Sequence, residues 1–231
     1  MRKLNRNELK YLAIAAMLID HIAWGFVPLQ SAAGQLMHFV GRLTGPTMAF
    51  FLAEGYIHTS NRRRYGLRLA IFALLSWPCF SWFETGHPFR LQFGVIYTLL
   101  LGFLAIALWD RRELDPGFKV FGTIALCMLS LFGDWAPLDV IWPLALWRFR
   151  DEPERKWRAF VGLAVVAVFL YGSGYEPIWL GAWALGIPAA ALLLKTCYNG
   201  EPGSRHPFHK WVFYVFYPAH LLILALLRWG I

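Results

Sequence analysis

Charged residues are scarce in this chain. Of its 231 residues, Asp, Glu, Lys and Arg make up 16%, while hydrophobic residues make up 58% and aromatic residues 17%. A soluble globular domain has about a quarter of its residues charged, so this composition excludes that class. The chain also contains no internal repeat and no low-complexity tract. We therefore expect one integral membrane domain over residues 1–231.

Cysteine is scarce as well. Cys79, Cys127 and Cys197 are widely separated and lie in or beside apolar segments, with no CxxC pair and no metal-ligand spacing. They are expected to be small core residues, and no metal site is predicted. A cleavable signal peptide is not expected either, because the first apolar run of about 19 residues exceeds the 7–15 residues of a signal core.

Long apolar runs are what the chain does have. A transmembrane helix needs about 20 mostly apolar residues, and runs bounded by charge, Gly and Pro predict an all-α polytopic bundle of about nine spans. The predicted spans are 9–27, 35–59, 66–84, 93–109, 118–133, 137–148, 157–173, 177–195 and 210–229. The sixth is short, so residues 133–148 can also be read as a re-entrant segment.

The basic residues indicate the orientation of the bundle. With the N-terminus in the cytoplasm, 19 of the 22 Lys and Arg residues fall in internal segments, whereas Arg90 and Arg228 fall outside and Arg42 lies within a span. Cytoplasmic segments of membrane proteins carry such an excess. The sequence thus predicts an N-in, C-out topology, and its net charge of +8 reflects contact with a lipid bilayer rather than with nucleic acid.

Two ionisable residues lie side by side in the first span. Asp20 and His21 are near the middle of residues 9–27, where a charged group costs about 2.5–3.5 kcal/mol on insertion scales. Such residues usually face the protein interior and have a function.

The second span contains Arg42 beside a stripe of small residues. Gly41, Gly45, Ala49 and Ala53 recur every four residues, which lets another helix approach closely. Arg42 is expected at about 10 Å depth, similar to that of His21.

A further histidine, His220, is expected near the midplane of the last span, just after Pro218. If the first, second and last spans pack together, Asp20, His21, Arg42 and His220 have the chemistry for acid–base work: a base, an orienting carboxylate and an anion-binding arginine. The alternative is an internal Asp20–Arg42 ion pair that only fixes helix packing.

The cytoplasmic turn after the second span is strongly basic. Arg62, Arg63 and Arg64 are typical of contact with anionic lipid. Arg68 already lies in the third span, where binding of a phosphate-bearing ligand explains it better.

Several motifs together resemble the TraX family, membrane proteins that include the acetylase of conjugative F-type pilin and that are related to transmembrane acyltransferases. The matching residues are Leu9-Lys10, Met17, Asp20-His21-Ile22, Gly41-Arg42-Leu43, Pro46, Phe51-Leu52, Glu54-Gly55, His58-Thr59, Asn61, Tyr65, Arg68-Leu69, Tyr97-Thr98-Leu99, Gly102, Phe216-Tyr217-Pro218 and His220-Leu221. They cover roughly residues 9–104 and 211–225, and the rest of the chain matches only as apolar spans.

The resemblance implies a multi-pass protein of the bacterial cytoplasmic (inner) membrane. It also implies transfer of an acetyl group from cytoplasmic acetyl-CoA to an extracytoplasmic acceptor, either an amine such as a pilin or peptide N-terminus or a sugar hydroxyl or amine. His21 would act as general base oriented by Asp20, or would carry the acyl group itself, and Arg42 or His220 would stabilise the oxyanion. The residues expected to bind acetyl-CoA are Glu54, His58, Asn61, Arg64, Tyr65, Arg68 and Thr98.

Two other functions remain open from the sequence. A proton-coupled small-molecule transporter would use the buried Asp20/His21 pair as a proton relay. A non-enzymatic assembly factor would need neither His21 nor Arg42. The sequence does not identify the acceptor or the oligomeric state.

Overall fold

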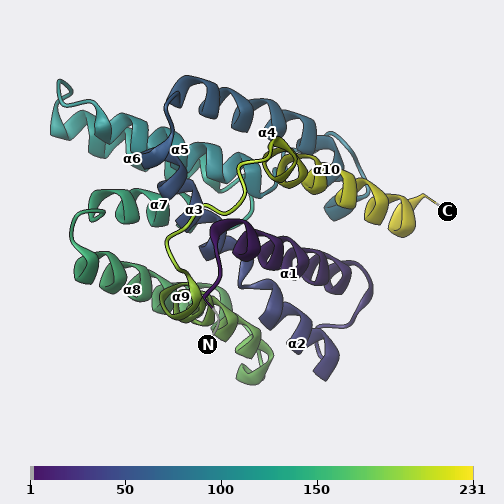
Figure 1. Ribbon diagram of the computed structural model, residues 1–231. Helices are drawn as coiled ribbons and strands as arrows, with labels where there is room; N and C mark the ends of the chain where they lie inside the picture. The colour runs from purple at the N-terminus through teal and green to yellow at the C-terminus, as the bar shows by residue number, and fades with distance from the viewer. Residues whose placement is uncertain (1–2, 231) are drawn as a thin grey trace.

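The computed structural model describes residues 3–230, and within these residues it is all-helical, with ten α-helices, one 3-10 helix and no β-strand. The elements are α1 (Arg6–Phe26), α2 (Ala32–Gly41), α3 (Thr44–His58), α4 (Arg62–Thr85), α5 (Val95–Asp110), α6 (Pro116–Ser130), α7 (Leu138–Arg148), α8 (Pro153–Gly172), η1 (Ile178–Leu185), α9 (Gly186–Cys197) and α10 (Pro207–Trp229). Figure 1 shows them as one helical bundle.

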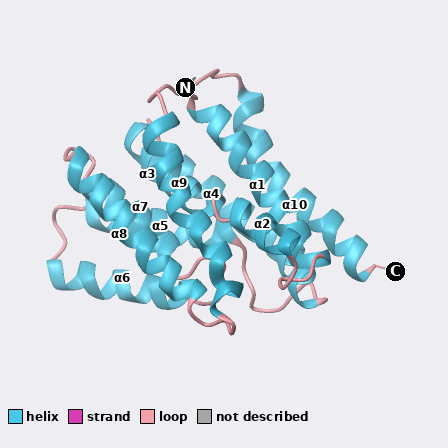
Figure 2. Ribbon diagram, turned by 90° about the horizontal axis from the view of Figure 1, so that it is seen from below, coloured by secondary structure: helices cyan, strands magenta, loops and turns pink. Residues whose placement is uncertain are grey.

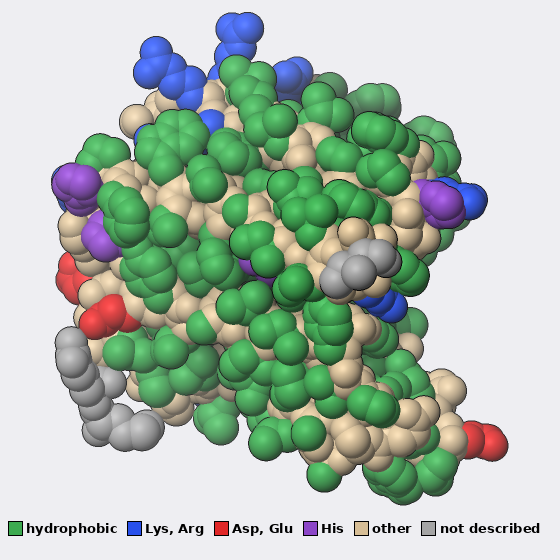
Figure 3. All heavy atoms as spheres, turned by 90° about the vertical axis from the view of Figure 1, so that its right-hand side faces the viewer, with side chains coloured by type: hydrophobic (Ala, Val, Ile, Leu, Met, Phe, Trp, Pro, Cys, Tyr) green, Lys and Arg blue, Asp and Glu red, His purple; other side chains and the backbone are tan. Residues whose placement is uncertain are grey.

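Within residues 3–230, four segments are long and apolar enough to cross a membrane, which agrees with a membrane protein. They are Arg6–Phe26, Arg62–Thr85, Ile178–Cys197 and Pro207–Trp229. Figure 3 shows one face of the molecule, covered largely by hydrophobic side chains with the charged groups mainly at its margins. The count of nine spans and the N-in, C-out orientation stay predictions.

Two predicted spans are not single α-helices. The segment 35–59 is divided into α2 and α3 at Arg42 and Leu43. Pro46, in the first turn of α3, has no N–H to bond to the carbonyl of Arg42, so the backbone hydrogen bond that would join the two helices at this position is missing. The segment 177–195 is likewise divided into η1 and α9.

The sixth predicted span is short in the structure too. α7 has 11 residues, which corresponds to about 16 Å of helix, roughly half the hydrocarbon thickness. α7 lies inside the bundle, packed against α3, α5 and α8, and Trp142 and Val140 are fully buried. A helix surrounded by other helices does not need to match the thickness of the bilayer.

Two of the α-helices begin with an asparagine side chain that caps the first turn, as their sequences favour. α1 begins with a capping box in which the Asn5 side chain accepts the N–H of Glu8 and the Glu8 carboxylate accepts the N–H of Asn5. Asn61 caps α4 by accepting the N–H of Arg64.

The loops gather at two ends of the bundle. The end that holds residues 3–5 is called the N-terminal end, and Figure 2 shows it from a second direction. Contacts that join segments at this end are Arg6 N–H with the Glu201 carbonyl, Glu54 with Lys156, and Arg62 with Asp110. Contacts that join segments at the opposite end are Phe93 N–H with the Phe132 carbonyl, Trp229 Nε1 with the Phe83 carbonyl, and Gln35 Nε2 with the Leu180 carbonyl.

Candidate functional site

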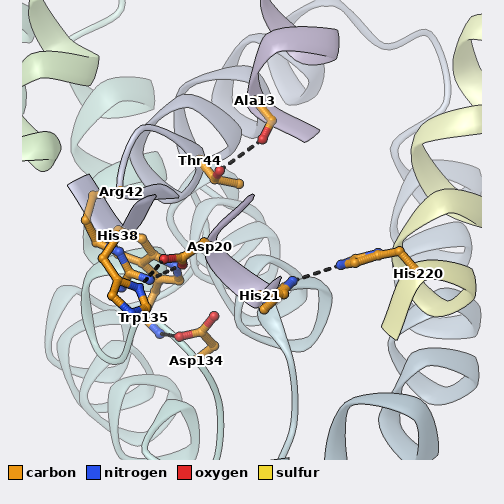
Figure 4. Close-up of polar contacts among 9 residues, drawn as sticks. All are labelled: Ala13, Asp20, His21, His38, Arg42, Thr44, Asp134, Trp135 and His220. Carbon is orange, nitrogen blue, oxygen red and sulfur yellow. Dashed lines mark hydrogen bonds and ion pairs between the residues drawn. The ribbon is translucent and has the colours of Figure 1, made fainter. Parts of the chain in front are cut away.

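Two buried histidines from opposite ends of the sequence meet in the bundle. His21 on α1 and His220 on α10 are each 5% exposed, and His21 Nδ1 lies 2.8 Å from His220 Nε2 (Figure 4). Pro218 does not stop α10, which continues to Trp229. The predicted approach of the first and last spans is therefore confirmed for these two side chains.

Hydrogen bonding assigns the tautomer of each ring. His220 Nδ1 lies 2.8 Å from the carbonyl oxygen of Phe216, and a carbonyl only accepts, so Nδ1 of His220 carries the proton. In a neutral pair His220 Nε2 is then the acceptor and His21 Nδ1 the donor. This leaves Nε2 of His21 unprotonated and without a hydrogen-bond partner within residues 3–230, and hence able to take a proton.

Asp20 contacts a different set of side chains. Its carboxylate accepts a hydrogen bond from His38 Nδ1 at 2.8 Å and forms an ion pair with Arg42 (Figure 4). Gly41 makes room for this contact, because a Cβ atom there would lie 2.3 Å from the Asp20 side chain. The prediction that small residues of the second span let another helix approach closely is thus confirmed at Gly41, where α2 meets α1.

Arg42 is held on both sides by aromatic rings. Its guanidinium lies 4.8 Å from the ring centroid of Trp135 and 5.0 Å from that of Trp183, at a distance typical of cation–π contacts. The Arg42 side chain therefore contacts two indoles and one carboxylate, and its Nε is buried without a hydrogen-bond partner within residues 3–230.

Asp134 lies close to this cluster, in the loop between α6 and α7. Its Oδ1 accepts the N–H of Trp135 at 2.9 Å. Burial raises the pKa of the Asp134 carboxyl to about 6, and the Arg42 guanidinium opposes this shift.

The four residues expected to act together, Asp20, His21, Arg42 and His220, thus form two separate pairs. Consecutive residues of an α-helix point about 100° apart, so Asp20 faces α2 while His21 faces α10. Within residues 3–230 no hydrogen bond joins Asp20 to His21, and the residue that orients His21 is His220. The ion-pair alternative for Asp20 and Arg42 agrees with this geometry.

A cavity of about 750 Å³ opens at the N-terminal end of the bundle, within the size range of ligand-binding cavities. Its walls come from α1, α3, α4, α5, α10 and the segment 198–206. In Figure 1 that segment runs from α9 to α10 past the start of α1, and it is tied there by the Arg6–Glu201 backbone bond.

Positive charge dominates the lining of this cavity. Its basic residues are Arg6, Lys10, Arg68, Arg205 and Lys210, with His58 and His209 beside them. Glu54 is the one carboxylate in the lining, and Lys156 binds it at 3.1 Å. Within residues 3–230 none of the five Lys and Arg side chains has an ion-pair partner, so the cavity attracts anions.

Three of these cations, Arg6, Lys10 and Arg68, are half-buried, whereas Arg205 and Lys210 are exposed. Lys10 is half-buried, with its Nζ 5.2 Å from the ring centroid of Phe213. Arg68 is half-buried against Tyr65, and its Nε is buried without a partner. An unpaired donor of this kind is suited to a phosphate oxygen.

The predicted ligand-binding residues divide into two groups. Four of them line the cavity: Glu54, His58, Tyr65 and Arg68. Asn61, Arg64 and Thr98 lie outside the lining, since Asn61 caps α4, Arg64 is exposed, and Thr98 donates to Asp139 at 3.0 Å.

Sequence reasoning counted Lys10 and Lys210 only as cytoplasmic charges, although their spacing holds a further signal. Lys10, Ile14, Met17 and His21 follow at i, i+4, i+7 and i+11, which is one face of α1. The first three of these residues line the cavity and the fourth bonds His220. On α10, Lys210, Tyr214 and Tyr217 line the cavity in the same way before His220. The cavity therefore leads along these two faces from the cations towards the histidine pair.

Within residues 3–230 no group of three or more His, Cys, Asp or Glu side chains is placed to hold a metal ion.

Comparison with known proteins gives a family assignment. The family model described as TraX protein matches residues 5–228. The chain is 33% identical over 230 residues to a protein of Dichelobacter nodosus named probable fimbrial assembly protein FimC, serogroup H1, and the match covers 94% of this chain and 93% of that one. No solved structure matches. With nearly its whole length matched by the family model, the chain belongs to the TraX family.

Proposed function

We propose that this protein is a membrane-embedded acetyltransferase. It would move an acetyl group from acetyl-CoA, bound at the N-terminal end of the bundle, to an acceptor that arrives from the opposite end. The observation that supports it best is the cavity with five unpaired cations, whose walls on α1 and α10 lead to His21 and His220.

The dimensions of the site favour an elongated ligand with an anionic head. Lys10 and His21 are 11 residues apart on α1, or about 16 Å along the helix axis. Acetyl-CoA has its phosphates at one end and its thioester at the other. Arg68 and Lys10 would hold phosphate oxygens while the apolar wall of Met17 and Leu99 contacts the uncharged arm.

The histidine pair supplies the base. The acceptor nitrogen or oxygen attacks the thioester carbon, and Nε2 of His21 takes the proton that the acceptor loses. The new bond to carbon forms, the carbon–sulfur bond breaks, and the departing thiolate receives the proton. His220 keeps Nδ1 of His21 protonated throughout, so Nε2 stays available.

The acceptor is proposed from the fimbrial relative. Because that relative is named a probable fimbrial assembly protein, we propose as acceptor the N-terminal amine of an exported fimbrial or pilin subunit. A sugar hydroxyl or amine is the other chemistry that the site allows.

The first test is binding to the purified protein. Acetyl-CoA and acetyl-dephospho-CoA are titrated by calorimetry into wild type, Arg68→Ala and Arg63→Ala. Loss of one charge-assisted contact is worth about 1.5–3 kcal/mol, so Arg68→Ala should weaken acetyl-CoA binding about tenfold or more. Arg63→Ala, on the exposed first turn of the same helix, should bind like wild type. Absence of binding at millimolar acetyl-CoA would contradict the proposal.

The second test is turnover. Release of CoA thiol is followed with peptides that carry a free N-terminal amine and with amino sugars as acceptors. His21→Ala should abolish release while expression and acetyl-CoA binding persist, and His87→Ala in an exposed loop should not change it. Full turnover in His21→Ala would refute the role of this base.

A further inference from the structure

Tyr217 occupies the inner end of the cavity, between the cavity and the histidine pair. Its side chain lines the cavity although the residue is only 2% exposed. Its ring centroid lies 6.3 Å from that of His21 and 5.6 Å from that of His220. Neither His21 nor His220 lines the cavity itself. Tyr217 is thus the α10 residue that contacts both the ligand space and the base.

The hydroxyl group of Tyr217 is fixed in place but keeps its proton free. The N–H of Val95, the first residue of α5, donates to Tyr217 Oη at 3.0 Å. Gly94 permits this approach, because a Cβ atom there would lie 2.0 Å from Oη. Oη is the acceptor in that bond, so its own proton is not used, and no group within residues 3–230 accepts that proton in a hydrogen bond.

Neither Arg42 nor His220, the residues expected to stabilise an oxyanion, lines the cavity. The guanidinium of Arg42 is bound to Asp20 and held between two Trp rings, on the side of α1 that faces α2 (Figure 4). His220 donates its one N–H to the Phe216 carbonyl, and its other ring nitrogen accepts from His21. Acyl transfer nevertheless needs a donor beside the carbonyl oxygen, where negative charge develops.

We infer that Tyr217 is a further catalytic residue, whose hydroxyl donates a hydrogen bond to the acyl carbonyl oxygen of the bound thioester. The inference rests on the proposed acetyltransferase function. As the acceptor attacks, the carbonyl π electrons move onto oxygen, and the Tyr217 O–H stabilises that charge without giving up its proton. When the carbon–sulfur bond breaks, the electrons return and the hydrogen bond weakens.

Binding of two matched ligands tests the contact without any need for turnover. S-ethyl-CoA has a methylene group where acetyl-CoA has its carbonyl, and is otherwise the same length. Both are titrated into wild type, Tyr217→Phe and Tyr171→Phe. Tyr171 is the matched control, because its hydroxyl bonds a backbone carbonyl, that of Ala136, away from the cavity lining.

Wild type and Tyr171→Phe should bind acetyl-CoA about three- to tenfold more tightly than S-ethyl-CoA, as expected for one hydrogen bond. Tyr217→Phe should bind both equally. A purely structural role for Tyr217 predicts instead that both ligands weaken together and that their ratio is kept, and that result would overturn the inference. If wild type binds neither ligand, the proposed function fails together with the inference.

Turnover with a peptide amine as acceptor gives an independent result. Removal of one oxyanion donor costs about a hundredfold or more in kcat, so Tyr217→Phe should lower kcat to that extent and raise the KM for acetyl-CoA by no more than the roughly three- to tenfold expected from the lost hydrogen bond. Equal kcat in Tyr217→Phe and wild type, with acetyl-CoA still bound, would refute the role of Tyr217 while leaving the acetyltransferase proposal intact.

Discussion

At the scale of single residues, two neighbours on one helix have separate surroundings. His21 bonds His220 and adjoins the inner end of the cavity, whereas Asp20 bonds Arg42 and His38 on the other side of α1. The rotation of about 100° per residue in an α-helix is the reason. Sequence adjacency in a buried segment therefore gives depth in the bilayer, but not a shared contact.

The Asp20–Arg42 pair leads to a prediction on stability. Removal of one partner from a buried ion pair leaves an uncompensated charge and typically costs about 3–5 kcal/mol. Asp20→Asn should therefore lower the Tm in detergent strongly. The double variant Asp20→Asn/Arg42→Met, which removes both charges and keeps a long side chain between Trp135 and Trp183, should recover at least half of the loss.

Thermal unfolding of Asp20→Asn, Arg42→Met and the double variant, with Arg63→Met as an exposed control, measures this coupling. If the double variant is destabilised by as much as Asp20→Asn and Arg42→Met together, the two residues do not act as a pair, and the electrostatic account of the contact is wrong.

At the scale of elements, small residues near the end of α2 and the start of α3 allow close contacts with neighbouring segments. Gly41 lies against Asp20, and Gly45 lies against Trp135, where a Cβ atom would come within 2.5 Å of the ring. These close approaches, together with Pro46, place the break between α2 and α3 beside α1. The break is what puts Arg42 at the end of a helix and within reach of Asp20.

Gly41 and Gly162 form a matched pair for testing the close approach. Gly41→Ala places a methyl group against the Asp20 side chain, and overpacking of this kind costs about 1–3 kcal/mol. Gly162, on α8, has nothing within 4 Å of an added Cβ, so Gly162→Ala should be neutral or stabilising by up to about 1 kcal/mol. Thermal unfolding of both variants tests this difference, and Gly41→Ala should have the lower Tm. Equal Tm values would show that α1 and α2 can move apart without loss of stability.

The sequence predicted the elements better than their contacts. Runs of apolar residues placed nearly every helix within a few residues, because burial in lipid demands length and apolarity from each segment separately. Pro46 marks the division of the segment 35–59 but does not predict it alone, because Pro78, Pro143 and Pro218 lie inside unbroken α-helices. The partner of His21 is set by the packing of α1 against α10, which lie about 200 residues apart in the sequence. The sequence indicated only that His220 lies at a similar depth, and not that it contacts His21.

At the scale of the whole molecule, the cavity is assembled from distant segments. Its cations come from α1, α4, α10 and the segment 198–206, and in the sequence each looks like an ordinary positive-inside charge. Arg68, Lys10 and Lys210 all fall within predicted spans, but a phosphate-bearing ligand was predicted only for Arg68. Lys10 and Lys210 were missed because their role appears only when the faces of α1 and α10 that carry them are followed to His21 and His220.

Segments at the two ends of the bundle also make the orientation testable. Residues 59–61 and Asp151 lie towards the N-terminal end, near the Glu54–Lys156 ion pair, while His87 lies towards the opposite end, where α10 bonds the Phe83 carbonyl. An N-in bundle then exposes His87 outside the cell. Single cysteines are placed at Arg63, His87 and Asp151, all exposed positions, after Cys79, Cys127 and Cys197 are replaced by Ala.

A membrane-impermeant maleimide added to intact cells should label His87→Cys, and should label Arg63→Cys and Asp151→Cys only after permeabilisation. Labelling of Arg63→Cys in intact cells would reverse the orientation and would place the cation-lined cavity away from cytoplasmic acetyl-CoA. Labelling of Asp151→Cys together with His87→Cys would mean that the segment 133–148 is re-entrant. The contact of Lys156 with Glu54 argues against that second outcome, because it holds the start of α8 beside the end of α3.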